Sequence, residues 1–172
     1  VDPADIADDQ IRRYRCVILD SLSEINEYCM YQLLKLSTDM HLDLDNMDVA
    51  EWPQFRKANQ MMQLTIRAYR DLPMHLILVA SSQFTQDETK RKMFAPNLTG
   101  KLAGQVQGFM DLVGYLVTGK ADEKSKIAPR RLYVQPVGNF AAKNRRSVYQ
   151  QAYIDNPVMS DIMGLLRLTP EK

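Results

Sequence analysis

The chain of 172 residues is predicted to form an α/β domain, with a mostly parallel sheet flanked by helices and finished by an antiparallel pair of strands. Three observations predict this class. Two continuous apolar runs, at residues 16–19 and 76–80, are typical of strands buried on both faces of a parallel sheet. Segments with helical apolar spacing alternate with these runs. Two further strand-like runs, 111–118 and 130–135, flank a polar turn and predict the antiparallel pair.

The first apolar run ends in Asp20, and an amphipathic helix is expected directly after it. Apolar residues from Leu22 to Leu36 recur there at intervals of three and four residues. Ser21 and Glu24 have the S-x-x-E spacing of a capping box, which predicts that the helix begins at this point.

A second, longer helix is expected between Pro53 and Pro73. It follows a polar, acidic loop at residues 37–48, and a proline is favoured at the first helical position. Its apolar stripe repeats every seven residues through Phe55, Met62 and Tyr69, and Ala58, Met61 and Ile66 widen it. The strand predicted at 75–80 then ends in the polar cluster 81–83.

The rest of the chain is expected to combine loops and short elements. Residues 84–97 lack apolar periodicity and are interpreted as a long loop, and residues 98–109 as a helix rich in small side chains. A short amphipathic helix is predicted at 158–166. We therefore divide the chain into a core at 1–146 and a C-terminal tail at 147–172.

The composition, with 45% hydrophobic and 25% charged residues, excludes collagen-like and disordered proteins. Cys16 and Cys29 lie in apolar surroundings without C-x-x-C spacing, so a reduced intracellular protein without structural zinc is expected. No apolar run approaches the ~20 residues that a membrane helix needs. We therefore expect no membrane partner and a cytoplasmic location, which is the bacterial host's cytoplasm if the gene belongs to a phage.

Charge is strongly segregated along the chain. Residues 1–51 carry a net charge of −8, whereas residues 84–146 carry +7. This asymmetry is consistent with a basic surface that binds a polyanion, and an ordinary solvated face is the alternative.

Asp20 follows four apolar residues at the end of a predicted strand, which is the pattern of a Walker B element. In such an element the carboxylate holds the magnesium ion that bridges nucleotide phosphates, because magnesium prefers hard oxygen ligands. In parallel sheets, ligands bind at the carboxyl ends of the strands, where Ser82 and Gln83 are also expected. The alternative is that Asp20 only opens the following helix.

Five stretches in this order and spacing resemble the RecA-like P-loop ATPases of phages, a group of AAA/RecA-like proteins that includes recombination and single-strand-annealing ATPases. The resemblance spans about Arg13 to Arg146. The five stretches are Cys16–Ile25, the helix start Glu51-Trp52, Val79–Gln83, Pro96–Lys101 and Phe140–Arg145.

The resemblance implies ATP and Mg²⁺ as cofactors. It makes Asp20 the residue that organises Mg²⁺ through water, and Ser82 or Gln83 the sensor of the γ-phosphate. Ser21 is expected in the same cofactor site. Glu24 either polarises the attacking water or serves only as a helix cap.

The resemblance also implies a homo-oligomer, as a ring or a filament. Lys143, Arg145 and Arg146 resemble basic residues that this family projects into the nucleotide site of the adjacent subunit. Such cations neutralise charge that develops on the transferred phosphoryl group. A contact with a DNA backbone and an ordinary basic surface remain alternatives for these residues.

Single-stranded DNA is the expected partner. The segment 84–97 occupies the position of a DNA-contacting loop in RecA-like proteins. Lys90, Arg91 and Lys92 would contact phosphates, and Phe94 would stack on a base.

The sequence departs from the family at one essential point. A phosphate-cradling P-loop requires G-x-x-x-x-G-K-[ST], and residues 1–172 contain no such element. The expectation is that Val1 falls within a longer reading frame or begins a truncated homologue, and that the chain does not hydrolyse ATP alone. The predicted function is thus a RecA-like ATPase core of a phage recombination or annealing protein without its P-loop unit. The alternative is a non-enzymatic protein that keeps the fold and binds single-stranded nucleic acid or supports assembly.

Overall fold

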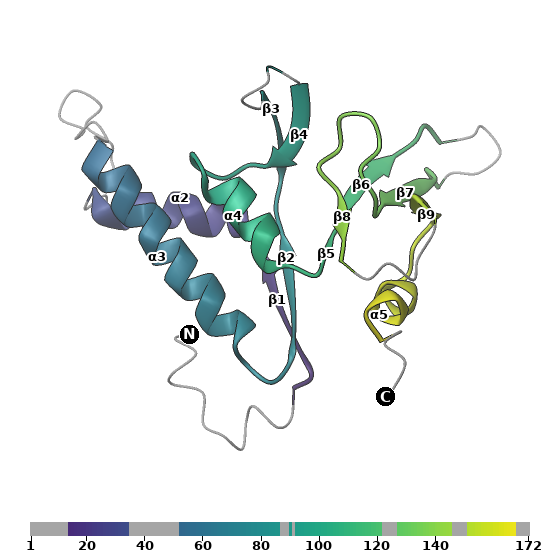
Figure 1. Ribbon diagram of the computed structural model, residues 1–172, viewed down its shortest axis with the longest axis horizontal. Coiled ribbons are helices and arrows are strands. Elements are labelled where there is room, and N and C mark those ends of the chain that lie inside the picture. Colours follow the sequence, from purple (N-terminus) through teal and green to yellow (C-terminus); the bar gives the residue numbers. More distant parts are fainter. Residues whose placement is uncertain are drawn as a thin grey trace. The chain divides into compact units, whose positions relative to one another are not determined.

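The structure, a computed structural model, describes residues 14–34, 52–86, 90, 92–121, 127–145 and 151–167 (Figure 1). Its internal contacts divide the chain into two compact units. The first unit comprises Val1–Ser82 and Pro96–Val106, and the second comprises Gln83–Ala95 and Gln107–Lys172. The boundary expected at residue 146 remains a prediction.

The first unit contains a pair of parallel strands. Strand β1 (Cys16–Asp20) and strand β2 (His75–Val79) run in register from Cys16 opposite His75 to Asp20 opposite Val79. Parallel neighbours need a long crossover connection, and helices α2 (Leu22–Leu33) and α3 (Trp52–Arg70) lie in the segment that joins them (Figure 1). Both strands and both helices were predicted at these places, and their existence is confirmed.

The predicted burial of these strands on both faces is wrong. Ile18 is 56% exposed and Val79 is 39% exposed. Within the described residues, β1 and β2 form a sheet of two strands, so neighbours that would cover their outer sides are missing there. A continuous apolar run is therefore compatible with partial exposure here.

The buried stripe of α3 differs from the predicted one in part. Ala58, Met62 and Ile66, spaced by four residues, are fully buried. Phe55 and Met61, which the sequence places on the apolar side, are 37% and 38% exposed. All three buried residues lie on the predicted stripe, which is therefore confirmed at its centre, whereas Phe55 and Met61 at its margins stay partly exposed.

The helix predicted at 98–109 is observed as α4 (Leu102–Phe109). Residues 98–101 instead form a turn, in which Gly100 has a φ of 55°. Glycine adopts this left-handed conformation at little cost, which explains why the helix begins after it.

The long loop predicted at 84–97 is wrong, because this segment carries two strands. Strand β3 (Ser82–Gln86) pairs with strand β4 (Lys92–Pro96). The exposure of β3 alternates from residue to residue, as expected of a strand with one covered face. Its polar composition concealed this pattern in the sequence.

The strand predicted at 111–118 is divided at Gly114 into β5 (Leu112–Val113) and β6 (Tyr115–Thr118). Strand β5 pairs with β8 (Lys143–Asn144), whereas β6 pairs with β7 (Arg130–Tyr133), and both pairs are antiparallel. A Cβ atom at position 114 would lie 2.7 Å from Leu132 Cδ1. The close approach of Leu132 thus requires glycine at this point.

The second unit is organised around the antiparallel sheet β6–β7–β9, with β9 at Tyr153–Asp155. The predicted antiparallel pair of 111–118 and 130–135 is confirmed in β6 and β7, and β9 was not predicted. Buried Leu132 and Val134 form a core with partly buried Leu112, Ile154 and Ile162. Ile162 comes from α5 (Met159–Arg167), which confirms the predicted tail helix (Figure 1).

The mostly parallel sheet that the sequence predicts is not what the described strands form. Of their pairs, β1–β2 is parallel, while β5–β8, β6–β7 and β7–β9 are antiparallel. Two helices, α2 and α3, lie between β1 and β2, whereas no helix lies between the paired strands β5 and β8, β6 and β7, or β7 and β9, which suits antiparallel pairing.

Replacing Gly114 by alanine is expected to lower the free energy of unfolding by about 1–3 kcal/mol, because the new methyl group displaces the buried side chain of Leu132. Urea unfolding measures this change. Gly104→Ala is the matched control: a Cβ there meets nothing within 4 Å, so alanine in α4 should stabilise by about 0.5–1 kcal/mol. Equal stability of the two variants would contradict the packing described for Gly114.

Candidate functional site

The carboxyl ends of β1 and β2 lie side by side. Because the strands are parallel and Asp20 is opposite Val79, the residues that follow each strand meet at the same edge. The expectation that the two strand ends are neighbours is therefore confirmed. This edge brings together Asp20, Ser21, Ser81 and Ser82, all within the first unit.

Asp20 presents an exposed carboxylate at the end of β1. Among the residues that the structure describes, no hydrogen bond or ion pair engages this carboxylate. The next peptide bond, between Asp20 and Ser21, is cis. Asp20 is thus the acidic group at this edge that is available to a cation or to water.

Ser21 is the N-cap residue of α2. Its Oγ accepts a hydrogen bond of 3.2 Å from the backbone N–H of Glu24, which confirms the predicted cap on the serine side. The carboxylate of Glu24 lies in the first helical turn, where negative charge is favoured by the helix dipole. Its predicted role in polarising water remains a prediction.

Ser81 is held against the first turn of α2 by Ser23. Ser23 Oγ lies 3.2 Å from the backbone nitrogen of Ser81 and 3.0 Å from its Oγ, and Ser23 is only 5% exposed. The carbonyl of Ser81 also accepts a hydrogen bond of 2.7 Å from the N–H of Asn97. Three bonds therefore fix the chain where it leaves β2, immediately before Ser82.

A polar cluster that the sequence did not reveal lies beside this edge. Thr99 Oγ1 is 2.6 Å from Asn59 Oδ1 and 3.3 Å from Asn26 Oδ1, and Asn26 is 6% exposed. The single hydroxyl proton of Thr99 serves one of the two oxygens at a time. The cluster ties the turn at 97–101 to α2 and α3. The available signal was the i, i+3 spacing of polar Ser23 and Asn26 within an otherwise apolar helix face.

The donor set at the strand ends fits a magnesium–nucleotide complex better than a protein-only metal site. Magnesium is bound by one or two carboxylates together with water and phosphate oxygens, and it prefers hard oxygen donors. Asp20 and the hydroxyls of Ser21 and Ser82 are donors of this kind. Within the described ranges, no group of three or more His, Cys, Asp or Glu side chains is arranged to hold a metal ion.

Lys143 and Arg145 lie in the second unit, at the C-terminal end of α4. Lys143 Nζ donates a hydrogen bond of 2.5 Å to the carbonyl of Gln107, and Arg145 donates to the carbonyl of Gly108. Arg145 also lies 3.6 Å from the carboxylate of Asp111. These cations satisfy carbonyl groups that have no partner within the helix. This capping role was not among the predicted ones, and their predicted action on a neighbouring subunit remains a prediction.

Burial lowers the pKa of the Lys143 ammonium, and the positive charge of Arg145 lowers it further, while Asp111 acts in the opposite direction. The protonated form of Lys143 is therefore less favoured than that of a fully exposed lysine. Arg146 lies outside the described residues.

The residues predicted to contact DNA belong to the second unit and lie near β3 and β4. Lys90 has a φ of 62° in the connection between the strands, and Lys92 opens β4. Phe94 is partly buried, and its ring contacts those of Phe84, Tyr115 and Phe140. Arg91 lies outside the described residues, and Gln83 belongs to this unit as the second residue of β3.

In the part of the chain that the structure describes, no helix combines the length and the apolar character needed to cross a membrane.

Comparison with known proteins assigns the chain to a family. A family model described as an AAA domain matches residues 1–146, which is most of the chain and includes both strand ends. The comparisons with curated proteins and with solved structures found no match.

The hydroxyl of Thr99 is expected to stabilise the strand-end edge. Thr99→Val keeps the shape of the side chain but leaves Asn59 and the buried Asn26 without the donor that they share, so the free energy of unfolding should fall by about 1–3 kcal/mol. Thr99→Ser keeps the hydroxyl and should cost clearly less. Urea unfolding of the two variants measures the difference, and indistinguishable midpoints would show that the hydrogen bonds contribute nothing.

Proposed function

Because the chain belongs to the AAA domain family, we propose that its nucleotide-binding role is that of a RecA-like P-loop ATPase core from a phage DNA recombination or single-strand-annealing protein. The observation that carries the proposal is the meeting of Asp20 with Ser81 and Ser82 at the carboxyl ends of two parallel strands. In open α/β sheets, ligands bind in this position.

Asp20 would hold Mg²⁺ through water, with oxygens of ATP completing its coordination. Bound there, the ion would neutralise charge on the β- and γ-phosphates. Ser21 and Ser82 present hydroxyl groups at the same edge, which can donate hydrogen bonds to phosphate oxygens. An uncharged donor at the position of Ser82 can distinguish three phosphates from two without repelling either.

Gln83 follows Ser82 directly and offers an amide for the same sensing role. Glu24 is the acidic residue in the first turn of α2, four residues after Asp20, and could orient the attacking water. A glycine-rich loop that cradles phosphates is needed in addition, because no residue named here supplies successive backbone N–H groups to the phosphates. Alone, this chain is therefore proposed to hydrolyse ATP poorly.

Lys143 and Arg145 are proposed to act on the nucleotide of an adjacent subunit in a homo-oligomer, a ring or a filament. In the structure both cations bind carbonyls at the end of α4. Acting in trans thus requires them to exchange a carbonyl partner for a phosphate oxygen. The stronger charge of the phosphate favours that exchange.

Single-stranded DNA is the proposed partner in the cytoplasm. Lys90 and Lys92 are exposed cations on the connection and strand next to β3, and Arg91 lies between them in the sequence. Lys92 Nζ lies 5.8 Å from the centre of the Phe84 ring, so charge and aromatic surface occur together. This observation also supports the second candidate, a non-enzymatic protein that binds single-stranded nucleic acid or supports assembly.

Removal of the Asp20 carboxylate should weaken Mg²⁺-dependent ATP binding by about 10–100-fold, in the range for residues that hold a metal through water. Titration with a fluorescent ATP analogue measures the affinity. Asp20→Ala and the parent are compared twice, once as this chain and once as a longer form that carries a glycine-rich loop. Asp71→Asn, an exposed acid paired with Arg70, is the control and should bind like the parent. If Asp20→Ala binds normally in the longer form, the proposed metal role is lost.

Replacing Lys90 and Lys92 by alanine should weaken single-stranded DNA binding uniformly across base sequences. The plot of log affinity against log salt should become shallower by about 0.7 for each phosphate contact removed. Fluorescence anisotropy at several salt concentrations measures the slope, with Lys57→Ala, an exposed lysine of α3, as the control. An unchanged slope would exclude these lysines from the DNA contact.

A further inference from the structure

The three-stranded sheet of the second unit carries a row of tyrosines on one face. Tyr115 of β6 lies directly opposite Tyr133 of β7, and Tyr133 lies opposite Tyr153 of β9. Directly paired residues project to the same side of a sheet. The rings of Tyr133 and Tyr153 are 6.0 Å apart between centres.

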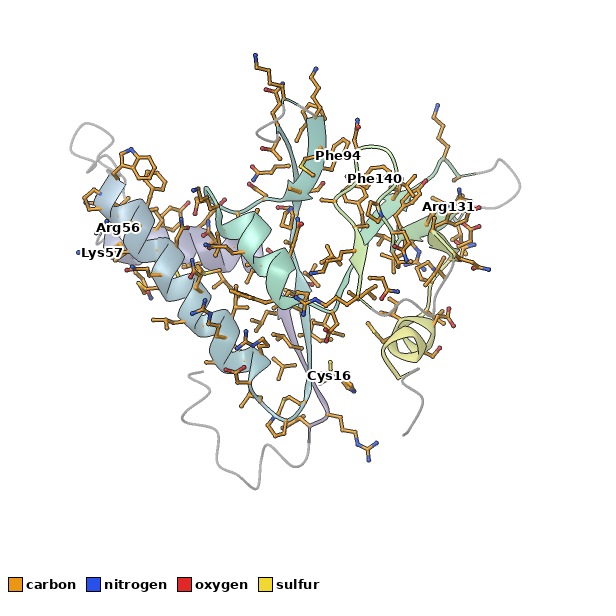
Figure 2. All side chains as sticks on the ribbon, viewed as in Figure 1. Cys16, Arg56, Lys57, Phe94, Arg131 and Phe140 are labelled. Carbon is orange, nitrogen blue, oxygen red and sulfur yellow. The ribbon has the colours of Figure 1, made fainter. Side chains whose placement is uncertain are left out.

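Three phenylalanines extend this row. Phe140 stacks on Tyr115, with centres 4.4 Å apart and planes at 18°, and its centre is 4.8 Å from that of Tyr133. The ring centre of Phe94 lies 5.7 Å from that of Phe140, and both residues are labelled in Figure 2. The ring centre of Phe84 lies 5.2 Å from that of Phe94. Successive ring contacts therefore connect Phe84 at one end with Tyr153 at the other. We name these six residues the aromatic row: Phe84, Phe94, Tyr115, Tyr133, Phe140 and Tyr153.

The aromatic row is distinct from the aliphatic core of this unit. Leu132 of β7 pairs directly with Ile154 of β9. Leu132 comes just before Tyr133 and Ile154 just after Tyr153, so both project to the opposite face of the sheet. That face packs with Val134 and with Ile162 of α5. The sheet thus has an aliphatic face that forms the core and an aromatic face of different character.

Both ends of the aromatic row are exposed, and each carries a cation. Phe84 is 54% exposed, with the Lys92 ammonium 5.8 Å from its ring centre. Tyr153 is 39% exposed, with the Arg131 guanidinium 3.8 Å from its ring centre. Arg131 is held by two bonds to Asp155, of 2.7 and 3.1 Å. Lys92 has no acidic partner within the described residues.

We propose that the aromatic row is a stacking platform for single-stranded DNA, on which unpaired bases stack against Phe84 and Tyr153 while Lys92 and Arg131 contact the adjacent phosphates. The inference rests on the DNA-binding role proposed above and adds the surface that performs it. The ligand is chosen by complementarity: the segment 84–146 has a net charge of +7, and DNA combines negative phosphates with flat aromatic bases.

In this proposal Phe84 and Tyr153 stack on the bases, whereas the sequence had assigned that role to Phe94. Phe94 contacts three rings and is partly buried, so it supports the row from within. Phe84 and Tyr153 instead expose ring surface that a base can cover. Every base has such a surface, so the platform should bind with little sequence preference.

The test measures binding of the full chain to a fluorescent oligothymidylate by anisotropy, without nucleotide. Phe84→Ala and Tyr153→Ala should each weaken binding by at least about 5-fold, the equivalent of losing one base stack. Phe84→Leu keeps an apolar side chain of similar bulk and should weaken binding as much, because it has no aromatic face. Leu116→Ala is the matched control, since Leu116 is 54% exposed on the opposite face of β6.

A second probe separates stacking from charge. An oligonucleotide of equal length with abasic sites keeps the phosphates and lacks the bases, so the parent should bind it more weakly and Phe84→Ala should bind it like the parent. Equal binding of both probes by the parent would overturn the platform, as would tighter binding of an RNA strand than of DNA.

The outcomes distinguish the platform from the function on which it rests. DNA binding that depends on Lys90 and Lys92 but not on Phe84 or Tyr153 would overturn the platform alone. Absence of DNA binding by the parent would overturn both the platform and the DNA role. The nucleotide titration of Asp20→Ala is independent of either result.

Discussion

The need to satisfy buried polar groups on α2 governs the arrangement of the first unit. Ser23 and Asn26 lie on the buried face of this helix, and leaving a buried hydroxyl or amide without a partner costs more than an ordinary hydrogen bond contributes. Ser81 supplies the partner for Ser23, and Thr99 supplies a hydroxyl that Asn26 shares with Asn59. The end of β2 and the turn at 97–101 are therefore bound to the first turn and a half of the helix that follows Asp20. An all-apolar face would allow the strand end to slide, because apolar contacts are not directional.

This arrangement leaves the Asp20 carboxylate outside the hydrogen bonds that hold the edge together. Ser23 and the backbone of Ser81 are used within the protein, whereas Asp20 is exposed at the same edge. Because the neighbouring backbone is held by these bonds, little backbone ordering adds to the cost of engaging a ligand at Asp20. Lys143 and Arg145 are in the opposite situation, because they already bind helix carbonyls. Their action on a phosphate therefore includes the cost of releasing those carbonyls.

Local signals predicted the elements whose structure is decided locally. The apolar run ending at Asp20, the cap at Ser21 and the spacing along α3 depend on neighbours within one turn or strand, so β1, α2 and α3 were found. Strands β3 and β9 were missed because they are short and polar, and only their partners in space stabilise them. The break at Gly114 likewise depends on Leu132, a residue distant in sequence. For the site, the strand ends were predictable from topology, whereas Thr99 and the aromatic row depend on tertiary contacts.

Strand β3 links the two proposed sites through the chain itself. Ser82 and Gln83, proposed to sense the γ-phosphate, are its first two residues, and Phe84, the exposed end of the aromatic row, is its third. Successive residues of a strand project to opposite faces, so the side chains of Gln83 and Phe84 leave β3 on different sides. The chain therefore passes from the nucleotide edge proposed in the first unit to the platform proposed in the second within two residues. Thermodynamic linkage then requires reciprocity: a nucleotide that changes DNA affinity by some factor has its own affinity changed by DNA to the same extent.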